Sequence, residues 1–301
     1  MLLSDLEVIL KISEHRSITA AAAHLDMRVA TASAALKRVE KALGAEIFIR
    51  TTRQLRLSSA GERYIPECEK ALLLLEQAKQ NIKEDLNVID GELRITLPSD
   101  LGRNVVTPWL DELLDKHPNL SLRVNLSDSQ IDFYRDSVDI ALRYGSPKDA
   151  GLYGFKICDT QGLLCASPRY LETHGTPQHP HELPAHNALF YQLYDKTHDV
   201  WEFTKDKQTY KVKMNGNRAS NDGDLVKHWC IEDKGLAVKS CLDLSNDILA
   251  GRLIPIMTDY QAKQNELWLI CPSRQSITPA VRLLRDTLRE KCAELIDRLA
   301  L

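Results

Sequence analysis

Residues 17–61 read SITAAAAHLDMRVATASAALKRVEKALGAEIFIRTTRQLRLSSAG, and this stretch decides the fold of the amino-terminal part of the chain. Small side chains between Thr19 and Leu25 predict a short helix that a second helix can approach closely. Asp26 to Arg28 predict a turn, and a second apolar stripe at helical spacing follows over residues 29–42. Two short helices joined by a tight turn form a helix-turn-helix.

Regular elements are also predicted on both sides of this motif. Before it, apolar residues at helical spacing predict a helix that ends near His15, with Ser4 as its N-cap and Glu7 completing a capping box. After it, Gly44 stops the helix, and residues 46–49 and 55–57 are short, β-prone segments separated by a basic turn. These two segments predict a hairpin wing with arginines at its tip.

The charge of the chain is unevenly distributed. The 301 residues carry a net charge of −3, but residues 1–63 hold ten Lys and Arg against seven Asp and Glu, a charge of +3. Residues 28–56 alone hold seven basic and two acidic side chains. Such a basic segment attracts phosphate backbones. An ordinary three-helix unit with a charged surface is the alternative to a helix-turn-helix, and the predicted wing favours the helix-turn-helix.

The same stretch resembles the winged helix-turn-helix of LysR-type transcriptional regulators. The resemblance is carried, without a gap, by Ser17, Thr19, Ala21, Ala22, Leu25, Ser33, Leu36, Glu40, Leu43, Gly44, Phe48, Arg50, Thr52, Arg53, Leu55, Leu57, Ser58, Ala60 and Gly61. It implies that the helix over 29–42 enters the major groove of double-stranded DNA and that the wing reaches the minor groove. The residues that it assigns to DNA are Arg28, Thr31, Ser33, Ala34, Lys37, Arg38 and Arg53. The sequence departs from the family at Ala34 and Ala35, where larger polar residues are common, so Arg28, Ser33 and DNA shape are expected to contribute more to specificity.

A long helix is predicted from Ser59 to about Ile89, with an apolar seam at heptad spacing. The seam residues expected to pair with a second copy are Ile65, Cys68, Leu72, Leu75, Ile82 and Leu86. The alternative is that this long helix packs on its own domain and pairs with no second copy. We expect a homodimer, and the family resemblance implies a tetramer and RNA polymerase as a further partner.

The rest of the chain predicts alternating strands and helices, hence a two-lobed α/β domain with parallel strands and a cleft between the lobes. The predicted fold is multi-domain: an all-α winged helix-turn-helix over 1–58, a linker helix over 59–90, and an effector domain over 91–301. Lobe I comprises 91–162 and 266–301, and lobe II comprises 163–265. The family's effector domain resembles periplasmic binding proteins.

The cleft is expected to bind a small-molecule effector, and our hypothesis is a small carboxylate. Ser99 and Asn221 each precede or open a helix, where free amides and a hydroxyl can hold an anion, although simple capping is the alternative. Lys239 offers a positive charge, or lies at a strand end facing water. With the residues that the family places in the pocket, the expected set is Ser99, Leu101, Gly102, Ser127, Arg143, Tyr144, Asn221 and Lys239, with Asp128 beside Ser127.

Other classes of protein fit the sequence less well. The absence of a nucleophile elbow, P-loop or dinucleotide fingerprint disfavours an enzyme, and the histidines between His174 and His186 lack the framing of a metal site. Seven cysteines without a C-x-x-C motif suit a reducing compartment, and neither Cys158 with Cys165 nor Cys230 with Cys241 resembles a redox pair. No apolar run is long enough for a membrane span and no signal peptide is seen, so we expect a cytoplasmic protein without cofactor or membrane partner. A small-molecule enzyme or binding protein whose front end merely dimerises remains the competing hypothesis.

Overall fold

The computed structural model describes residues 2–50, 55–85, 89–129, 133, 138–147, 149, 151–193 and 196–299. The chain forms two compact units, Met1–Asn87 and Val88–Leu301, which are described separately below. No helix among the described residues is long and apolar enough to cross a membrane.

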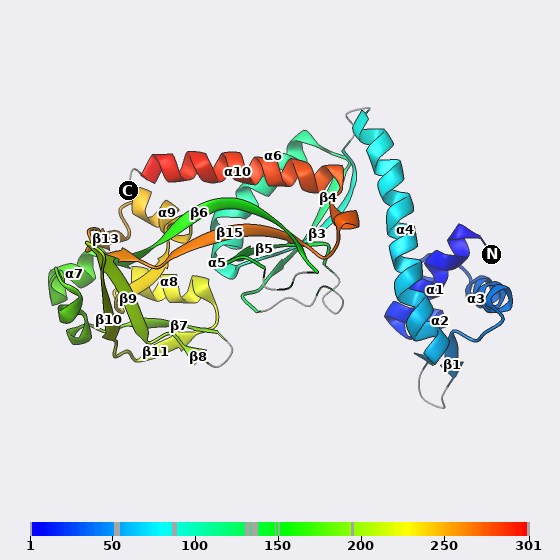
Figure 1. The fold of residues 1–301 in the computed structure, drawn as a ribbon, viewed down its shortest axis with the longest axis horizontal. Helices are drawn as coiled ribbons and strands as arrows, with labels where there is room; N and C mark the ends of the chain where they lie inside the picture. Colours follow the sequence, from blue (N-terminus) through cyan, green and yellow to red (C-terminus); the bar gives the residue numbers. More distant parts are fainter. Residues whose placement is uncertain are drawn as a thin grey trace. The chain divides into compact units, whose positions relative to one another are not determined.

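The amino-terminal unit consists of four helices and a two-stranded hairpin (Figure 1). Its elements are α1 (Leu3–His15), α2 (Ile18–His24), α3 (Val29–Leu43), β1 (Phe48–Arg50), β2 (Leu55–Leu57) and α4 (Ser59–Asp85). Local features of the sequence set the helix ends. At the start of α2 the Ser17 hydroxyl accepts from the Ala20 amide at 3.2 Å, and Gly44 ends α3 with a φ of 65°. The helix-turn-helix and its hairpin are therefore present.

One predicted helix start was wrong, and one predicted helix end is not tested. Helix α1 begins at Leu3 rather than after Ser4, because the Asp5 carboxylate, not Ser4, accepts from the Leu2 amide at 2.9 Å. Helix α4 was predicted to reach about Ile89; it is described as far as Asp85, Ile89 is not helical, and residues 86–88 lie outside the described part of the chain.

A close contact fixes the start of α4 against the segment before the wing. A Cβ at Gly61 would lie 2.2 Å from the Ile47 carbonyl oxygen, so only glycine allows this approach. The Glu40 carboxylate accepts from the Ile47 amide at 2.9 Å and ties α3 to the same segment. The core between these elements is built from Val8, Ile9, Ile12, Ala21, Ala22, Ala32, Ala35, Leu36, Val39, Ile47, Phe48, Ile65 and Cys68.

The carboxyl-terminal unit is organised around one seven-stranded sheet (Figure 1). Its strands are β3 (Gly91–Leu97), β4 (Leu120–Leu126), β5 (Ile140–Tyr144), β6 (Tyr153–Ala166), β12 (Ala237–Ser240), β13 (Ile254–Ile256) and β15 (Gln264–Cys271). Strands β4 and β5 pair parallel to β3, as predicted, whereas β15, β12 and β13 join antiparallel. Within this sheet, the expectation of parallel strands therefore holds only for β3, β4 and β5; outside it, β11 (Arg218–Ser220) pairs parallel to β7 (Leu189–Leu193).

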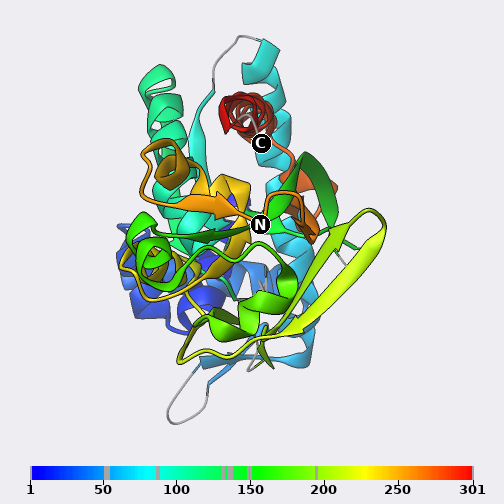
Figure 2. The same ribbon diagram turned by 90° about the vertical axis from the view of Figure 1, so that its left-hand side faces the viewer.

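Helices cover this sheet. A continuous helical stretch after β3 contains α5 (Ser99–Leu101), a π-helical segment (Gly102–Val106) and α6 (Thr107–Lys116). The closing helix α10 (Pro279–Leu299) packs on β6, α6 and α9 (Cys241–Leu249), and Figure 2 shows it nearly end-on. The helix predicted over 131–137 lies almost entirely outside the described residues.

The second half of this unit has its own small core beside the shared sheet. It contains α7 (Pro168–His174), α8 (Gly223–Ile231), a 3₁₀ helix (Pro180–Ala185) and two three-stranded sheets. The sheet strands are β7 (Leu189–Leu193), β8 (Lys196–Thr197), β11 (Arg218–Ser220), β9 (Val200–Lys205), β10 (Gln208–Lys213) and β14 (Gln261–Ala262). We keep the names lobe I and lobe II for the predicted residue ranges; the long strand β6 runs from the first into the second.

Candidate DNA-binding face and effector site

Helix α3 has one buried and one exposed face. Ala32, Ala35, Leu36 and Val39 are buried in the core of the amino-terminal unit. The six residues predicted for DNA on and just before this helix are all exposed or partly exposed: Arg28, Thr31, Ser33, Ala34, Lys37 and Arg38. Ala35 is 1% exposed, so it packs inside the unit and does not face the groove. The predicted wing residue Arg53 lies outside the described residues.

Arg38 is not a freely extended arginine. Its guanidinium donates to the Asp5 carboxylate of α1 through Nε at 3.2 Å and Nη2 at 2.5 Å. The hydrogen bond from Arg38 lowers the pKa of Asp5, which is 1% exposed. Since the Arg38 side chain is still 49% exposed, it can face a phosphate while it joins α3 to α1.

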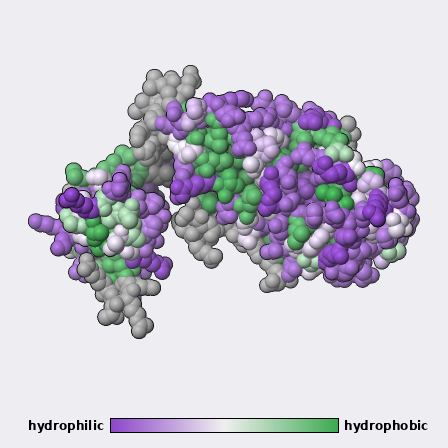
Figure 3. Space-filling model, turned by 180° about the vertical axis from the view of Figure 1, so that it is seen from behind, coloured by the Kyte–Doolittle hydropathy of each residue, from purple (hydrophilic) through white to green (hydrophobic). Residues whose placement is uncertain are grey.

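The predicted pairing seam of α4 begins later than expected. Ile65 and Cys68 are 7% and 4% exposed and belong to the core of their own unit, so they are not available to a second copy. Leu72 is partly buried and Leu75 is 50% exposed. The side chain of Ile82 and the whole of Leu86 lie outside the described part. Figure 3 shows hydrophobic patches on the surface of both units.

In the carboxyl-terminal unit, the starts of two helical stretches converge on one carboxylate. Asp128, just after β4, accepts from the Ser99 amide and the Ser99 hydroxyl, each at 2.7 Å. The same carboxylate accepts from the Gly223 amide, the first of α8, at 2.9 Å. Ser99 and Asp128 belong to lobe I and Gly223 to lobe II, so these contacts join the lobes.

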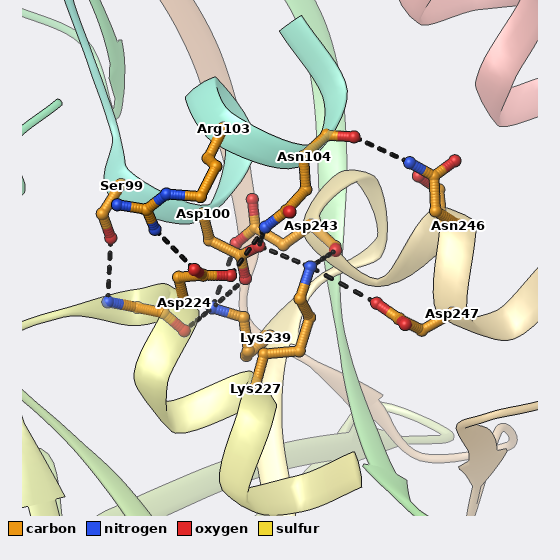
Figure 4. A network of polar contacts seen from close by, with 12 residues as sticks. Ser99, Asp100, Arg103, Asn104, Asp224, Lys227, Lys239, Asp243, Asn246 and Asp247 are labelled. Carbon is orange, nitrogen blue, oxygen red and sulfur yellow. Dashed lines mark hydrogen bonds and ion pairs between the residues drawn. The ribbon is translucent and has the colours of Figure 1, made fainter. Parts of the chain in front are cut away.

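Beside this position lies a buried group of charges, which we call the inter-lobe cluster (Figure 4). Its members, Asp100, Lys227, Lys239, Asp243 and Asp247, have side chains that are at most 9% exposed. Lys227 Nζ lies 2.5 Å from Asp100 and 3.3 Å from Asp247. Lys239 Nζ lies 2.8 Å from Asp100 and 3.5 Å from Asp243, and it donates to the Gly223 carbonyl at 2.8 Å.

Burial and charge act against each other in this cluster. Burial disfavours the charged form of Lys239, but Asp243 and Asp100 outweigh it and raise the pKa of Lys239. Burial raises the pKa of Asp243 to about 6 in spite of its neighbour Lys239. The Tyr144 hydroxyl donates to Asp243 at 2.7 Å, and burial raises the pKa of that hydroxyl. The cluster therefore contains one carboxyl that titrates near neutral pH.

More exposed contacts also bridge the π-helical segment and lobe II. Arg103 pairs with Asp224 of α8 at 2.5 Å, and the Asn104 amide group donates to Asp224 at 2.6 Å. The Asn246 side chain of α9 donates to the Asn104 carbonyl at 2.8 Å. Together with the buried contacts, they hold the two lobes against each other.

Comparisons with known proteins agree on one family. The family described as "LysR substrate binding domain" matches residues 87–293, and "Bacterial regulatory helix-turn-helix protein, lysR family" matches residues 3–62. The chain belongs to the LysR family of transcriptional regulators. Because its relatives are transcriptional regulators, this chain is a regulator rather than an enzyme.

Individual relatives match over nearly the whole chain. The HTH-type transcriptional regulator DmlR of Escherichia coli is 30% identical over 97% of this chain and 95% of its own length. The activator TtdR of Escherichia coli is 29% identical over 89% of this chain and 86% of its own. CrgA of Neisseria meningitidis, a LysR-type regulator of known structure, is 26% identical with a TM-score of 0.59 and covers 99% of both chains.

In this LysR-type regulator the structure brings only part of the predicted effector set together. Ser99 and Lys239 lie at the junction of the lobes, and Lys239 is buried there rather than facing water. Tyr144 reaches the cluster through Asp243. Arg143 lies close by and donates to the Thr96 hydroxyl at 2.7 Å.

The other predicted effector residues have local roles. Leu101 is fully buried in the main core, and a Cβ at Gly102 would lie 2.7 Å from Leu97, so both are packing residues. The Ser127 hydroxyl accepts from the Ser129 amide at 3.2 Å, and Asn221 is exposed beside α8. Leu101 and Gly102 therefore have packing roles and Asn221 is exposed, and their contact with an effector stays a prediction.

Several site residues were missed because their partners are distant in sequence. Asp100, Lys227, Asp243 and Asp247 come from α5, α8 and α9, and no spacing rule connects these elements. Tyr191 of β7 was also missed; burial is the main cause that raises the pKa of its hydroxyl, and the charge of Asp128 adds to it.

The histidines and cysteines have structural surroundings. Among the described residues, no group of three or more His, Cys, Asp or Glu is placed to hold a metal ion. His179 packs against Tyr210 and Tyr260. All seven cysteines are free thiols, and Cys165 lies nearest to Cys230, with 3.9 Å between the sulfur atoms, not to Cys158.

Proposed function

We propose that this regulator binds an imperfect inverted-repeat operator in double-stranded DNA with two copies of α3. The exposed face of α3, with Arg28, Ser33 and Lys37 above a buried apolar face, is the observation that supports it. A two-fold dimer offers two such helices to two half-sites, which explains the inverted repeat. The proposed partners also include a second pair of subunits and RNA polymerase, and the proposed location is the cytoplasm.

The proposed signal is a small carboxylate that binds between lobes I and II. Two helix starts, with the Ser99 hydroxyl and the nearby Lys239 ammonium, offer the donors and positive potential that a carboxylate needs. The effector is the only small molecule in this proposal, which includes no cofactor or metal.

Operator binding is tested with the DNA immediately upstream of the protein's own coding sequence and a random fragment of equal length. We expect tighter binding to the upstream DNA, with an affinity that falls steeply as salt rises, because basic side chains displace counterions. Lys37→Ala should weaken binding to both fragments and reduce the salt slope by about one. No binding to either fragment at low salt would overturn the proposal.

The effector site is tested by a thermal-shift screen of small carboxylates on the full-length protein. Ser99→Ala should weaken binding of any hit, because the Ser99 hydroxyl faces the proposed position. Asn221→Ala is the matched control, since Asn221 is exposed just before α8, the other helix start at this junction. Equal affinities of the wild type and the Ser99 variant would remove Ser99 from the site.

A further inference from the structure

The position proposed for the effector carboxylate already holds a carboxylate of the chain itself. Asp128 Oδ1 accepts from the Ser99 amide, and Oδ2 accepts from the Ser99 hydroxyl and the Gly223 amide. The first amides of a helix have no partner within the helix, and here the first amides of two helical stretches share one acceptor group. A fourth contact, from the Gly223 amide to the Ser99 hydroxyl at 3.0 Å, closes the arrangement.

The surroundings leave room for this one anionic group. The Cβ position of Gly223 lies 3.2 Å from Lys239 Nζ, 3.4 Å from Asp128 Oδ2 and 3.6 Å from the Ser99 hydroxyl, so these three polar groups surround the start of α8 closely. The ammonium of Lys239 and two helix starts all place positive potential here. A second carboxylate could not use the same donors, and the two negative charges would repel each other.

We propose that Asp128 is an internal ligand of this site, which holds lobes I and II together in the absence of effector, and that an effector carboxylate binds by displacing it. This inference rests on the proposed carboxylate effector. Its consequence is that the protein without effector is closed around its own side chain. Competition with Asp128 then lowers the apparent affinity for the effector, because attachment to the chain gives Asp128 a high effective concentration.

The test is chemical rescue of full-length Asp128→Ala by acetate, followed as the melting temperature Tm in sodium acetate against sodium chloride at equal ionic strength. Removing the carboxylate leaves its donors open, so acetate should raise the Tm of the variant by about 3 °C at ten times its dissociation constant, and further with the logarithm of its concentration. The Tm of the wild type should not respond, because the tethered Asp128 excludes acetate.

Two controls separate rescue from a general effect of acetate. Asp128→Asn keeps the volume of the side chain, so acetate has no space and should not raise its Tm. Asp224→Ala removes a carboxylate that bridges the lobes through Arg103 elsewhere, and acetate should not rescue it either. A response of all three variants, or of none, would overturn the inference.

If Asp128→Ala does not fold in chloride, the readout becomes the yield of folded protein purified in acetate or in chloride. Folding in acetate alone supports the inference, and failure in both salts contradicts it. Salt-dependent DNA binding of the wild type is measured separately, so a failed rescue with intact operator binding counts against the internal ligand and not against the regulator.

Discussion

At the scale of single residues, the charges buried between the lobes are the most demanding feature of this protein. Two lysines face three aspartates, and each of these side chains is at most 9% exposed. Buried charges are tolerated only when they are paired, because desolvation of each ion costs several kcal/mol. Burial is the main cause that raises the pKa of Asp243, and the negative charge of Asp100 adds to it. When this carboxyl is protonated, two cations face two anions.

Lys227→Met should lower the free energy of unfolding of the carboxyl-terminal unit by about 3 kcal/mol or more, because it leaves Asp100 with a single cation and removes a donor to the Asp243 carbonyl. Urea unfolding followed by tryptophan fluorescence measures this loss. Lys234→Met is the control, since Lys234 is exposed and its replacement should change stability little. Similar stabilities of the two variants would contradict the pairing.

Asp243 should make the protein gain stability on mild acidification. The pKa of Asp243 is about 6 in the folded chain and 3.8 for the unperturbed group, so the folded state binds the proton more tightly. Its stabilising contribution is fully present below pH 3.8 and is lost as the pH rises through about 6. Urea unfolding is measured between about pH 4.5 and about pH 7.5, a range that brackets this titration. The wild type should lose stability relative to Asp243→Asn as the pH rises. Parallel profiles would contradict this assignment.

At the scale of elements, the sequence predicts best what is determined locally. The limits of α2 and α3 agree within one residue with those predicted, because Ser17 and Gly44 mark helix ends through their own conformations. The hairpin of β9 and β10 was missed, although Trp201 and Phe203 alternate with exposed residues, because its turn at Asp206 and Lys207 lacks glycine.

Long-range pairing explains the remaining differences. The direction of β15 is set by its pairing with β5 and β6, more than a hundred residues earlier in the chain, and no local pattern encodes it. The same holds for the site. Ser99 and Lys239 could be singled out by their places at element ends, whereas Asp243 and Lys227 acquire their roles only when α8 and α9 meet α5.

Helix α4 carries a prediction at this scale. Since Ile65 and Cys68 pack inside their own unit, the seam available to a second copy begins at Leu72 and continues through Leu75. Leu75→Glu should weaken dimerisation at least about tenfold, because one buried leucine contributes about 1.5 to 3 kcal/mol. Sedimentation equilibrium measures the change.

The neighbouring Leu74 provides the matched control for this prediction. Leu74 is 49% exposed, much like Leu75, but it lies off the heptad seam. Leu74→Glu should therefore leave the dimer intact, and circular dichroism checks that both variants are folded. If the two substitutions weaken the dimer equally, the seam is wrongly placed.

At the scale of the whole molecule, charge and ligand binding divide between the units. Residues 1–63 carry +3 and the remainder −6, so the long-range field favours approach to DNA through this first segment of the chain. An effector that binds between the lobes can change operator affinity only if it binds the two states of the assembly with different affinity. Displacement of Asp128 supplies such a difference when the lobes are closed in one state and separated in the other.

This coupling must be reciprocal. If the carboxylate found in the screen changes the operator affinity by some factor, within about 5 to 150 for typical coupling energies, saturating operator DNA must change the affinity for that carboxylate by the same factor. Fluorescence anisotropy of labelled operator, with and without the carboxylate, gives the first factor. Calorimetric titration of the carboxylate, with and without operator, gives the second. Unequal factors would show that the two sites do not share one two-state equilibrium, and a factor of one for both would show that the cleft binds its ligand without reporting it to the DNA-binding unit.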